Sequence, residues 1–403
     1  MNKDSEQLTA DLSLHEAQDQ PLKGRKMQDV VISTLGKDKC CIEEVLSRKV
    51  LVFRHENRKT VILPRAVTYL GNPHPIFKKR IQLPKWFKDF VIGIQKENDI
   101  DDIRLLGVYH YNGNVVFVDF ASENYLGRRM HNSSAHVYVN DLYQGMRYGI
   151  FKKKDANDNE ITTVRRDKLS VYLTGGGAVE PNLFDLFRQF NNGYPFGEWL
   201  YALDKIREMH TDDWLKWRET EWAGWFLEYR FNKFVNDNNV SDKMRYISQK
   251  KKDEWDFDIR FDDDDFYGDL KASDITKKEA PGNDRENLTE CICRHEKFWY
   301  IIYEHETIRD KDRNGEATAA RVKYIKSIDP EFSKEETSYA SRMKYSVRFM
   351  RMCIIELNRI NYREVLSDFI QGRQPDGTAR KVKFKINKNN IDNFVVFRYS
   401  YGE

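Results

Sequence analysis

The chain has 403 residues, of which 33% are charged and 13% aromatic, and its formal net charge is +3. This length is enough for two or three domains. The many aromatic residues beside the many charges indicate a folded protein with a charged surface and exclude a largely disordered chain. The balanced charge excludes a uniformly basic protein, so any positive surface that binds nucleic acid must be local.

The cysteines and the hydropathy of the chain point to the cytoplasm. Five cysteines are an odd number, and their CC and CxC spacings fit neither a disulfide framework nor the paired CxxC of a zinc ribbon. No apolar run approaches the roughly 20 residues that cross a membrane, and the polar N-terminus lacks the apolar core of a signal peptide. We therefore expect a cytoplasmic protein with reduced thiols and no membrane partner.

The N-terminal part is predicted to be a tail followed by a β-rich domain. Residues 1–28 are mostly polar, and we expect a mobile tail or a short loose helix there. Short β-branched runs follow, among them KVLVFRH, KTVILP, IRLLGVYHY and NVVFVDF, and turn residues separate them, as in YNGN at 111–114. This pattern predicts a β-rich domain over residues 29–175, built as a sandwich or an open barrel.

Basic stretches make this first domain the candidate for DNA recognition. Lys and Arg supply affinity for phosphates, while Arg or Asn can read base edges. A solvated face is an equally good interpretation of any one stretch, but together the stretches favour double-stranded DNA as a partner. The candidate contact residues are Lys78, Lys79, Arg80, Lys85, Lys88, Arg128, Arg129 and Asn132.

Residues 176–403 are predicted to form a helical segment and a mixed α/β domain. Aromatic residues recur at three- and four-residue steps in DDWLKWRETEWAGWFLEYRFNKFV, which predicts a helix. Two strand-like runs, WDFDIRF and FYGDLKA, come next, followed by a helix near 286–293 and a strong strand, FWYIIYEHE. We expect a long helical region over about 331–370 and a final hairpin from KVKFKI and NFVVFRY. The fold class is thus mixed α+β, with an α/β C-terminal domain that carries added helices.

Alternation in WDFDIRF predicts a strand with one apolar and one acidic face. Neighbouring side chains of a strand point to opposite faces, so Phe257, Ile259 and Phe261 should share one of them. Asp256 and Asp258 then lie on the other face. Either acid could be the first ligand of a metal ion, and the sequence leaves the choice between them open.

The next run, FYGDLKA, places Asp269 and Lys271 on one face. The acidic segment 262–265 is short enough to close the two strands as a hairpin, and a solvated turn is its favoured interpretation. Antiparallel pairing would bring Asp258 towards Asp269 and Lys271. Two carboxylates on adjacent strands can hold Mg²⁺, for which we expect Mn²⁺ to substitute, and a nearby ammonium can stabilise developing charge.

This pattern resembles the PD-(D/E)XK nuclease superfamily, in which an acid on one strand is followed by acid-x-Lys on the next. Asp258 matches the first acid, while Asp269 and Lys271 match the second half of the motif. The family usually carries an acid on the preceding helix, for which Glu221 and Glu228 are candidates, seven residues apart and so roughly on one helix face. Two departures are that no proline precedes Asp258 and that the second acid is Asp, where Glu is commoner.

The resemblance covers about residues 215–310 and implies a metal-dependent endonuclease that hydrolyses DNA. A large separate recognition domain is similar to the arrangement of type II or modification-dependent restriction endonucleases, which implies a cognate DNA methyltransferase in the same system. Cutting both strands needs two active sites, which favours a homodimer. The alternatives are a less specific phage-defence nuclease and a non-catalytic DNA-binding protein whose acidic hairpin is structural.

Overall fold

Two compact units make up the chain in the computed structural model. They are Met1–Glu180 and Pro181–Glu403, so the division falls slightly after the boundary expected between 175 and 176. Both units mix helices and strands, which confirms the mixed α/β fold class. No helix in the described part of the chain is long and apolar enough to span a membrane. The structure describes residues 4–96, 99–127, 133–175, 182–247, 255–332, 343–370 and 380–402.

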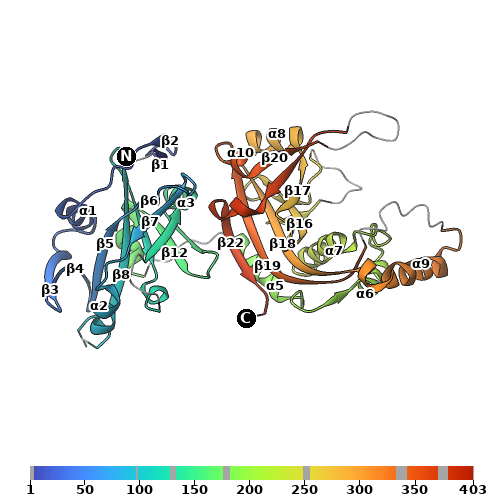
Figure 1. The fold of residues 1–403 in the computed structure, drawn as a ribbon, viewed down its shortest axis with the longest axis horizontal. Helices are drawn as coiled ribbons and strands as arrows, with labels where there is room; N and C mark the ends of the chain where they lie inside the picture. Colours follow the sequence, from blue (N-terminus) through green and yellow to red (C-terminus); the bar gives the residue numbers. More distant parts are fainter. Residues whose placement is uncertain are drawn as a thin grey trace. The chain divides into compact units, whose positions relative to one another are not determined.

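A seven-stranded sheet is the main layer of the first unit (Figure 1). Along the chain its strands are β3 (Cys40–Val45), β4 (Arg48–His55), β5 (Arg58–Ala66), β8 (Asp102–Tyr111), β9 (Asn114–Phe120), β11 (Ile150–Lys154) and β12 (Glu160–Arg165). Their spatial order is β11-β12-β9-β8-β5-β4-β3, and β5 and β8 are the one parallel pair among them. Parallel neighbours need a crossover, and the chain between β5 and β8 contains helix α2 (Phe87–Ile94).

Both faces of this sheet are covered. Every residue of β9 is buried, and its alternate residues belong to two different core clusters. One cluster contains α1 (Arg25–Leu35), and the other contains α2 and a small sheet. That sheet has the order β10-β7-β6, with β6 at Thr68–Tyr69, β7 at Lys78–Gln82 and β10 at Ser134–Tyr138. The unit is completed by α3 (Val139–Tyr148) and α4 (Leu169–Leu173).

The first residues of the chain form a hairpin within the fold. Strands β1 (Ser5–Leu8) and β2 (Leu14–Ala17) pair in an antiparallel register, and every residue of β1 is buried. The hydroxyl of Tyr109 accepts the backbone N–H of Leu8 at 2.7 Å. The prediction of a mobile tail is therefore wrong for the described residues, 4–28, because polar side chains there find hydrogen-bond partners inside the fold, which polarity alone does not reveal.

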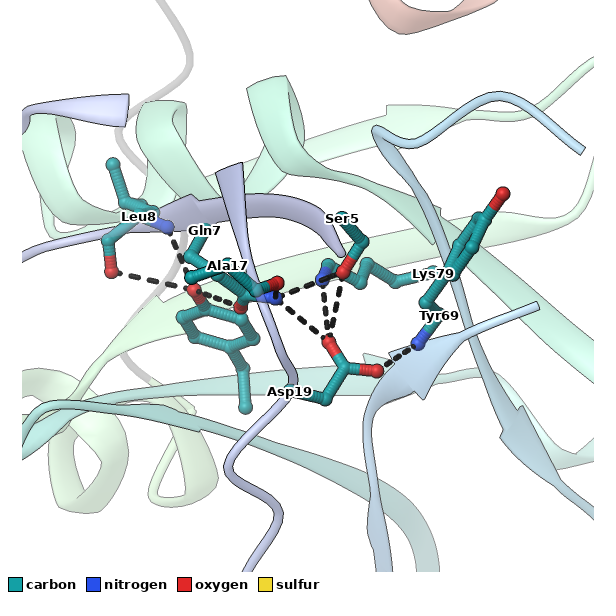
Figure 2. Close-up of polar contacts among 8 residues, drawn as sticks. Ser5, Gln7, Leu8, Ala17, Asp19, Tyr69 and Lys79 are labelled. Atoms are coloured by element: carbon teal, nitrogen blue, oxygen red, sulfur yellow. Dashed lines mark hydrogen bonds and ion pairs between the residues drawn. The ribbon is translucent and has the colours of Figure 1, made fainter. Parts of the chain in front are cut away.

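A buried lysine holds this hairpin in place (Figure 2). Lys79 of β7 is fully buried, and its ammonium donates to Ser5 Oγ at 2.8 Å and to Asp19 Oδ1 at 2.7 Å. The other carboxylate oxygen of Asp19 accepts the backbone N–H of Tyr69 at 2.6 Å. An ammonium enclosed in this way cannot reach a phosphate. The assignment of Lys79 to DNA contact is therefore wrong, and its role is structural.

The second unit is built on a mixed sheet (Figure 1). Along the chain its strands are β13 (Leu200–Tyr201), β14 (Arg245–Tyr246), β15 (Ile259–Phe261), β16 (Phe266–Asp274), β18 (Lys297–Arg309), β19 (Lys344–Asn358) and β22 (Val395–Ser400). Their spatial order is β13-β19-β18-β16-β15-β14, and β22 also pairs with β19. Strands β16 and β18 are parallel, and helix α8 (Arg285–His295) lies in the crossover between them.

Helices cover both faces of this sheet. Phe298 and Trp299 are consecutive in β18 and so point to opposite faces. Trp299 stacks on a phenylalanine of α5 (Asn182–Asn192) with ring centroids 5.4 Å apart, and α5 packs on α7 (Trp222–Asp237) through another pair of stacked phenylalanines. Phe298 shares a core cluster with apolar residues of α8. Thus α5 and α7 lie on one face and α8 on the other.

Two expectations for the C-terminal part are wrong. The helical region expected over about 331–370 contains β19, because pairing with β18 on one side and β22 on the other outweighs the helix-favouring residues of this segment. The expected final hairpin does not form, since its two strands lie in different sheets. The remaining elements are α6 (Ala202–Thr211), α9 (Glu316–Ile328), α10 (Tyr362–Val365) and a sheet of order β17-β21-β20, comprising β17 (Glu279–Asp284), β20 (Leu366–Phe369) and β21 (Lys383–Asn387).

We expect Lys79→Ala to destabilise the first unit. The substitution leaves the Asp19 carboxylate without its cation, and breaking a buried ion pair in this way costs about 3–5 kcal/mol. Urea unfolding of the full chain measures the effect. Arg80→Ala is the matched control, since the next side chain along β7 is only half-buried and should change the free energy of unfolding by about 1 kcal/mol or less. Equal losses in the two variants would contradict a special role for Lys79.

Candidate functional site

Three carboxylates and one ammonium lie close together where β15 begins beside β16. The antiparallel register pairs Ile259 with Gly268, so the preceding Asp258 and the following Asp269 come opposite each other. Lys271 lies two residues further along β16, and its ammonium forms an ion pair with Asp269. The fourth member, Glu228 of α7, is buried, and the charges of Asp269 and Lys271 both act on its pKa. The structure thus brings together the residues expected from the motif.

Backbone hydrogen bonds fix the position of Asp258. Its Oδ2 accepts the backbone N–H of Leu270 at 2.9 Å. Its own carbonyl oxygen accepts the backbone N–H of Ile247 at 2.8 Å. The carboxylate therefore accepts a hydrogen bond from β16 in place of a neighbouring strand, just before β15 begins. This contact sets the direction of the side chain independently of any ligand.

A bend at Asp258 breaks the expected alternation of side chains. Phe257 packs against Phe298 with ring centroids 4.8 Å apart, whereas Phe261 packs against Trp299 at 5.1 Å. Because Phe298 and Trp299 point to opposite faces of β18, Phe257 and Phe261 lie on opposite faces of the sheet. The prediction that they share one apolar face is wrong, since the strand begins only after the bend.

The two alternative acids lie apart from this cluster. Asp256 is exposed, and within the described residues no contact joins it to Asp269 or Lys271. Glu221 is the exposed N-cap residue of α7, and its charge acts on the ammonium of Lys344. Of each pair of candidates left open by the sequence, the structure places Asp258 and Glu228 in the cluster.

Burial and mutual repulsion raise the pKa of two of these acids. Burial, followed by the charge of Asp269, raises the pKa of Glu228 to about 7. Burial, followed by the charges of Asp269 and Glu228, raises the pKa of Asp258 well above its usual range. Burial alone would lower the pKa of Lys271, but the charges of Asp269 and Asp258 outweigh it and raise this pKa. With every member ionised, three carboxylates and one ammonium carry a net charge of −2, so the cluster lacks positive charge.

Tyr246 is a member of the site that the sequence analysis missed. Its hydroxyl donates to Glu228 Oε2 at 2.6 Å, and its ring lies 5.4 Å from that of Trp214. Burial, followed by the charge of Glu228, raises its pKa, so the hydroxyl stays protonated and remains a donor. The two-residue strand that carries Tyr246 is too short to show any periodicity, and no signal in the sequence identifies it.

The oxygen donors of the cluster are of the kind that Mg²⁺ prefers. Asp269 is 2% exposed, and its Oδ2 accepts no hydrogen bond of regular geometry in the described part, although the Lys271 ammonium contacts it. Among the described residues, no group of three or more His, Cys, Asp and Glu side chains is arranged as a metal-binding cluster. A hard divalent cation that keeps several waters needs only one or two carboxylates, so the donor set fits Mg²⁺ in kind.

The candidate DNA contacts of the first unit differ in their accessibility. Lys85 is exposed, while Lys78, Arg80 and Lys88 are half-buried. Each of these four keeps a part of its side chain at the surface, in contrast to the enclosed Lys79. The remaining candidates, Arg128, Arg129 and Asn132, lie outside the described residues.

We expect Glu228→Gln to stabilise the chain at alkaline pH. A carboxyl pKa raised from 4.5 to about 7 lowers the free energy of unfolding only where the group is ionised in the unfolded state. This loss is absent below about pH 4.5, grows up to about pH 7 and is constant above. Glu228→Gln should therefore raise the free energy of unfolding by about 1–3 kcal/mol at pH 8, and by much less at pH 4.5.

Urea titrations at the two pH values measure this difference. Glu221→Gln is the matched control, because it removes an exposed acid at the start of the same helix and should change the free energy of unfolding by about 0.5 kcal/mol or less. A Glu228→Gln variant that is no more stable than the wild type at pH 8 would rule out a strained carboxylate at this position.

Comparison with known proteins identifies a family over part of the first unit. Residues 58–173 match the family model Methylase-associated X1 (MTaX1). This segment runs from the start of β5 to the end of α4. No nuclease family model matches the chain. No curated protein and no solved structure is significantly similar to it. The first unit therefore contains a match to a methylase-associated domain, while the second unit is characterised by its own geometry alone.

Proposed function

We propose that this chain is a metal-dependent DNA endonuclease of the PD-(D/E)XK type. The observation that carries the proposal is the convergence of Asp258, Asp269, Lys271 and Glu228 at one edge of β16, with a deficit of positive charge among them. The order of elements supports it, since α7 is followed by the β15–β16 hairpin, helix α8 and the parallel strand β18. Helix, hairpin, helix and strand are the elements that the resemblance to this superfamily implies.

The residues of the cluster have distinct roles in this proposal. Asp258 and Asp269 would hold a Mg²⁺ ion, which neutralises charge on a phosphodiester and activates water when bound. Lys271, kept protonated by its acidic neighbours, donates to the attacking water or to a phosphate oxygen. Glu228 has a pKa near neutrality and can accept a proton at physiological pH, while Tyr246 holds its carboxylate in place.

The family match supports a place for this chain in a restriction-modification system. The description of the matched family names association with a methylase. We infer that the first unit recognises double-stranded DNA and that a DNA methyltransferase acts in the same system. The chain would then be a type II or modification-dependent restriction endonuclease. Cleavage of both strands by a chain with one such cluster would require two copies, so a homodimer is expected on DNA.

A non-catalytic DNA-binding partner of a methylase is the second candidate function. The match over residues 58–173 favours it, because this match concerns the first unit and does not involve the acidic cluster. Such a protein would bind DNA but leave it intact with every metal ion. A less specific defence nuclease differs from both, since it would degrade DNA to a smear in place of discrete fragments.

We expect Asp258→Asn, Asp269→Asn and Lys271→Met each to abolish cleavage of plasmid and phage DNA. Loss of a metal ligand or of a charge-stabilising ammonium should reduce the cleavage rate by about 10²–10³-fold or more. The two Asn variants keep the size of the side chain and remove repulsion, so they should stay folded. Asp256→Asn is the matched control, because this exposed residue precedes the bend and should leave cleavage unchanged.

Gel analysis of methylated and unmethylated DNA distinguishes the candidate functions. Mg²⁺ or Mn²⁺ should support cleavage into discrete fragments, whereas Ca²⁺ should support binding with little cleavage. Full activity in excess EDTA, or normal cutting by all three cluster variants, would refute the proposed site. Tight binding without cleavage under every metal would favour the second candidate.

A further inference from the structure

We propose that Arg48, Arg65 and Trp86 form a phosphate-binding patch with which the first unit holds the backbone of duplex DNA. The proposal rests on the inference that this unit recognises DNA, and it names the surface that does so. None of these three residues was a candidate from the sequence. The two arginines are separated by 16 residues in the sequence and lie on strands that pair with each other.

The two arginines lie on neighbouring strands. Strands β4 and β5 are antiparallel, and their pairing runs from Leu51–Ile62 to His55–Arg58. Arg48 begins β4 and Arg65 lies near the end of β5, just beyond the paired residues. Like charges that lie close together repel each other, and an anion from outside the chain can compensate this repulsion.

The guanidinium groups of Arg48 and Arg65 both lie over the ring of Trp86. The Cζ atom of Arg48 lies 4.4 Å from the centre of the Trp86 ring, and that of Arg65 lies 5.3 Å from it. The turn before Arg48 is packed on α2, since a Cβ built at Gly93 would lie only 2.7 Å from a methyl carbon of Leu46. The turn before Arg48 thus contacts α2, at whose start Trp86 lies.

Within the described residues, no acidic side chain forms an ion pair with Arg48 or Arg65. The Nε atom of Arg65 is buried without a hydrogen-bond partner, and Nη1 only approaches the carbonyl oxygen of the preceding residue at 3.4 Å. Burial lowers the pKa of this guanidinium, which is the direction expected when no carboxylate lies beside it. By contrast, Arg54 pairs with Glu43, and Arg104 pairs with a buried aspartate.

A nucleic-acid backbone supplies the negative charge that this patch lacks. Guanidinium groups bind phosphate oxygens with two parallel N–H donors. Lys85 and Lys88 flank Trp86 in the sequence and both reach the surface. Asp89 in the same segment is exposed, and no described ion pair joins it to these cations. Two arginines on one ring, with two more cations in the adjoining segment, match the repeated charge of a duplex better than the charge of a single small anion.

Binding of duplex DNA without metal tests the patch in the full-length chain. The probe is a fluorescein-labelled duplex of about 30 base pairs in EDTA, followed by fluorescence anisotropy between about 50 and 250 mM NaCl. Arg48→Gln/Arg65→Gln should weaken binding by about tenfold or more, and should reduce the slope of log Kd against log salt by about two, because two phosphate contacts are lost. Arg48→Lys/Arg65→Lys should restore most of the slope, since it keeps both charges.

Arg54→Gln is the matched control, because it removes an arginine of the same strand that is already paired with Glu43. Its affinity and salt slope should stay within about twofold of the wild type. Thermal melting shows whether each variant is folded. If the double Gln variant melts early, Arg48→Gln alone, at an exposed position, should reduce the salt slope by about one.

Several outcomes would overturn the patch. These are an unchanged salt slope in the folded double Gln variant, an equal loss in Arg54→Gln, and a wild-type chain that binds an RNA hairpin but no duplex DNA. The assay contains no metal and measures no cleavage. If the chain binds DNA through the patch but never cuts it, the proposed nuclease function is refuted and the proposed patch is not. A chain that cuts DNA while its double variant binds normally would refute only the patch.

Discussion

The hydrogen bond from the backbone of Leu270 to the carboxylate of Asp258 links the fold of the second unit to its candidate site. Strand β16 pairs with β18 along most of its length, but β15 covers only its first three residues. A backbone N–H beyond that point needs another acceptor, and Asp258 provides one at 2.9 Å. The acid is thereby held opposite Asp269. Repulsion between the two carboxylates is built into the strand pairing and does not depend on a freely rotating side chain.

The repulsion between these carboxylates supports a functional role for the cluster. Asp258, Asp269 and Glu228 share the ammonium of Lys271, and burial together with the charge of Asp269 raises the pKa values of Asp258 and Glu228. A site with no role beyond stability would gain from neutral residues of the same size, because buried carboxylates without matching cations destabilise a fold. Closely spaced, buried acids with perturbed pKa values are typical of functional sites. A divalent cation would supply the missing positive charge.

Local alternation was enough to predict Asp269 and Lys271, because β16 is a long regular strand whose residues obey the two-residue period. The same rule failed for Phe257, where the chain bends before the strand begins. It could not reveal Tyr246, which lies in a strand of two residues, or the strand β19, which lies in a segment expected to be helical. In each failure the deciding interaction joins residues that are distant in the sequence, such as the pairing of β19 with β18 and β22.

The positively charged residues of the first unit show most clearly that local sequence does not reveal interactions between distant residues. Lys79, Arg54 and Arg65 are equivalent as charges in the sequence, yet the structure gives each a different role. Lys79 is enclosed by polar partners of the N-terminal hairpin, and Arg54 is neutralised by a glutamate across the strand pair. Arg65 shares the ring of Trp86 with Arg48, and among the described residues no ion pair joins it to an acid. A net charge of +3 therefore says little about DNA binding. DNA binding depends on the cations that have no acidic partner in the fold. Only these cations can exchange water for phosphate without first breaking an ion pair.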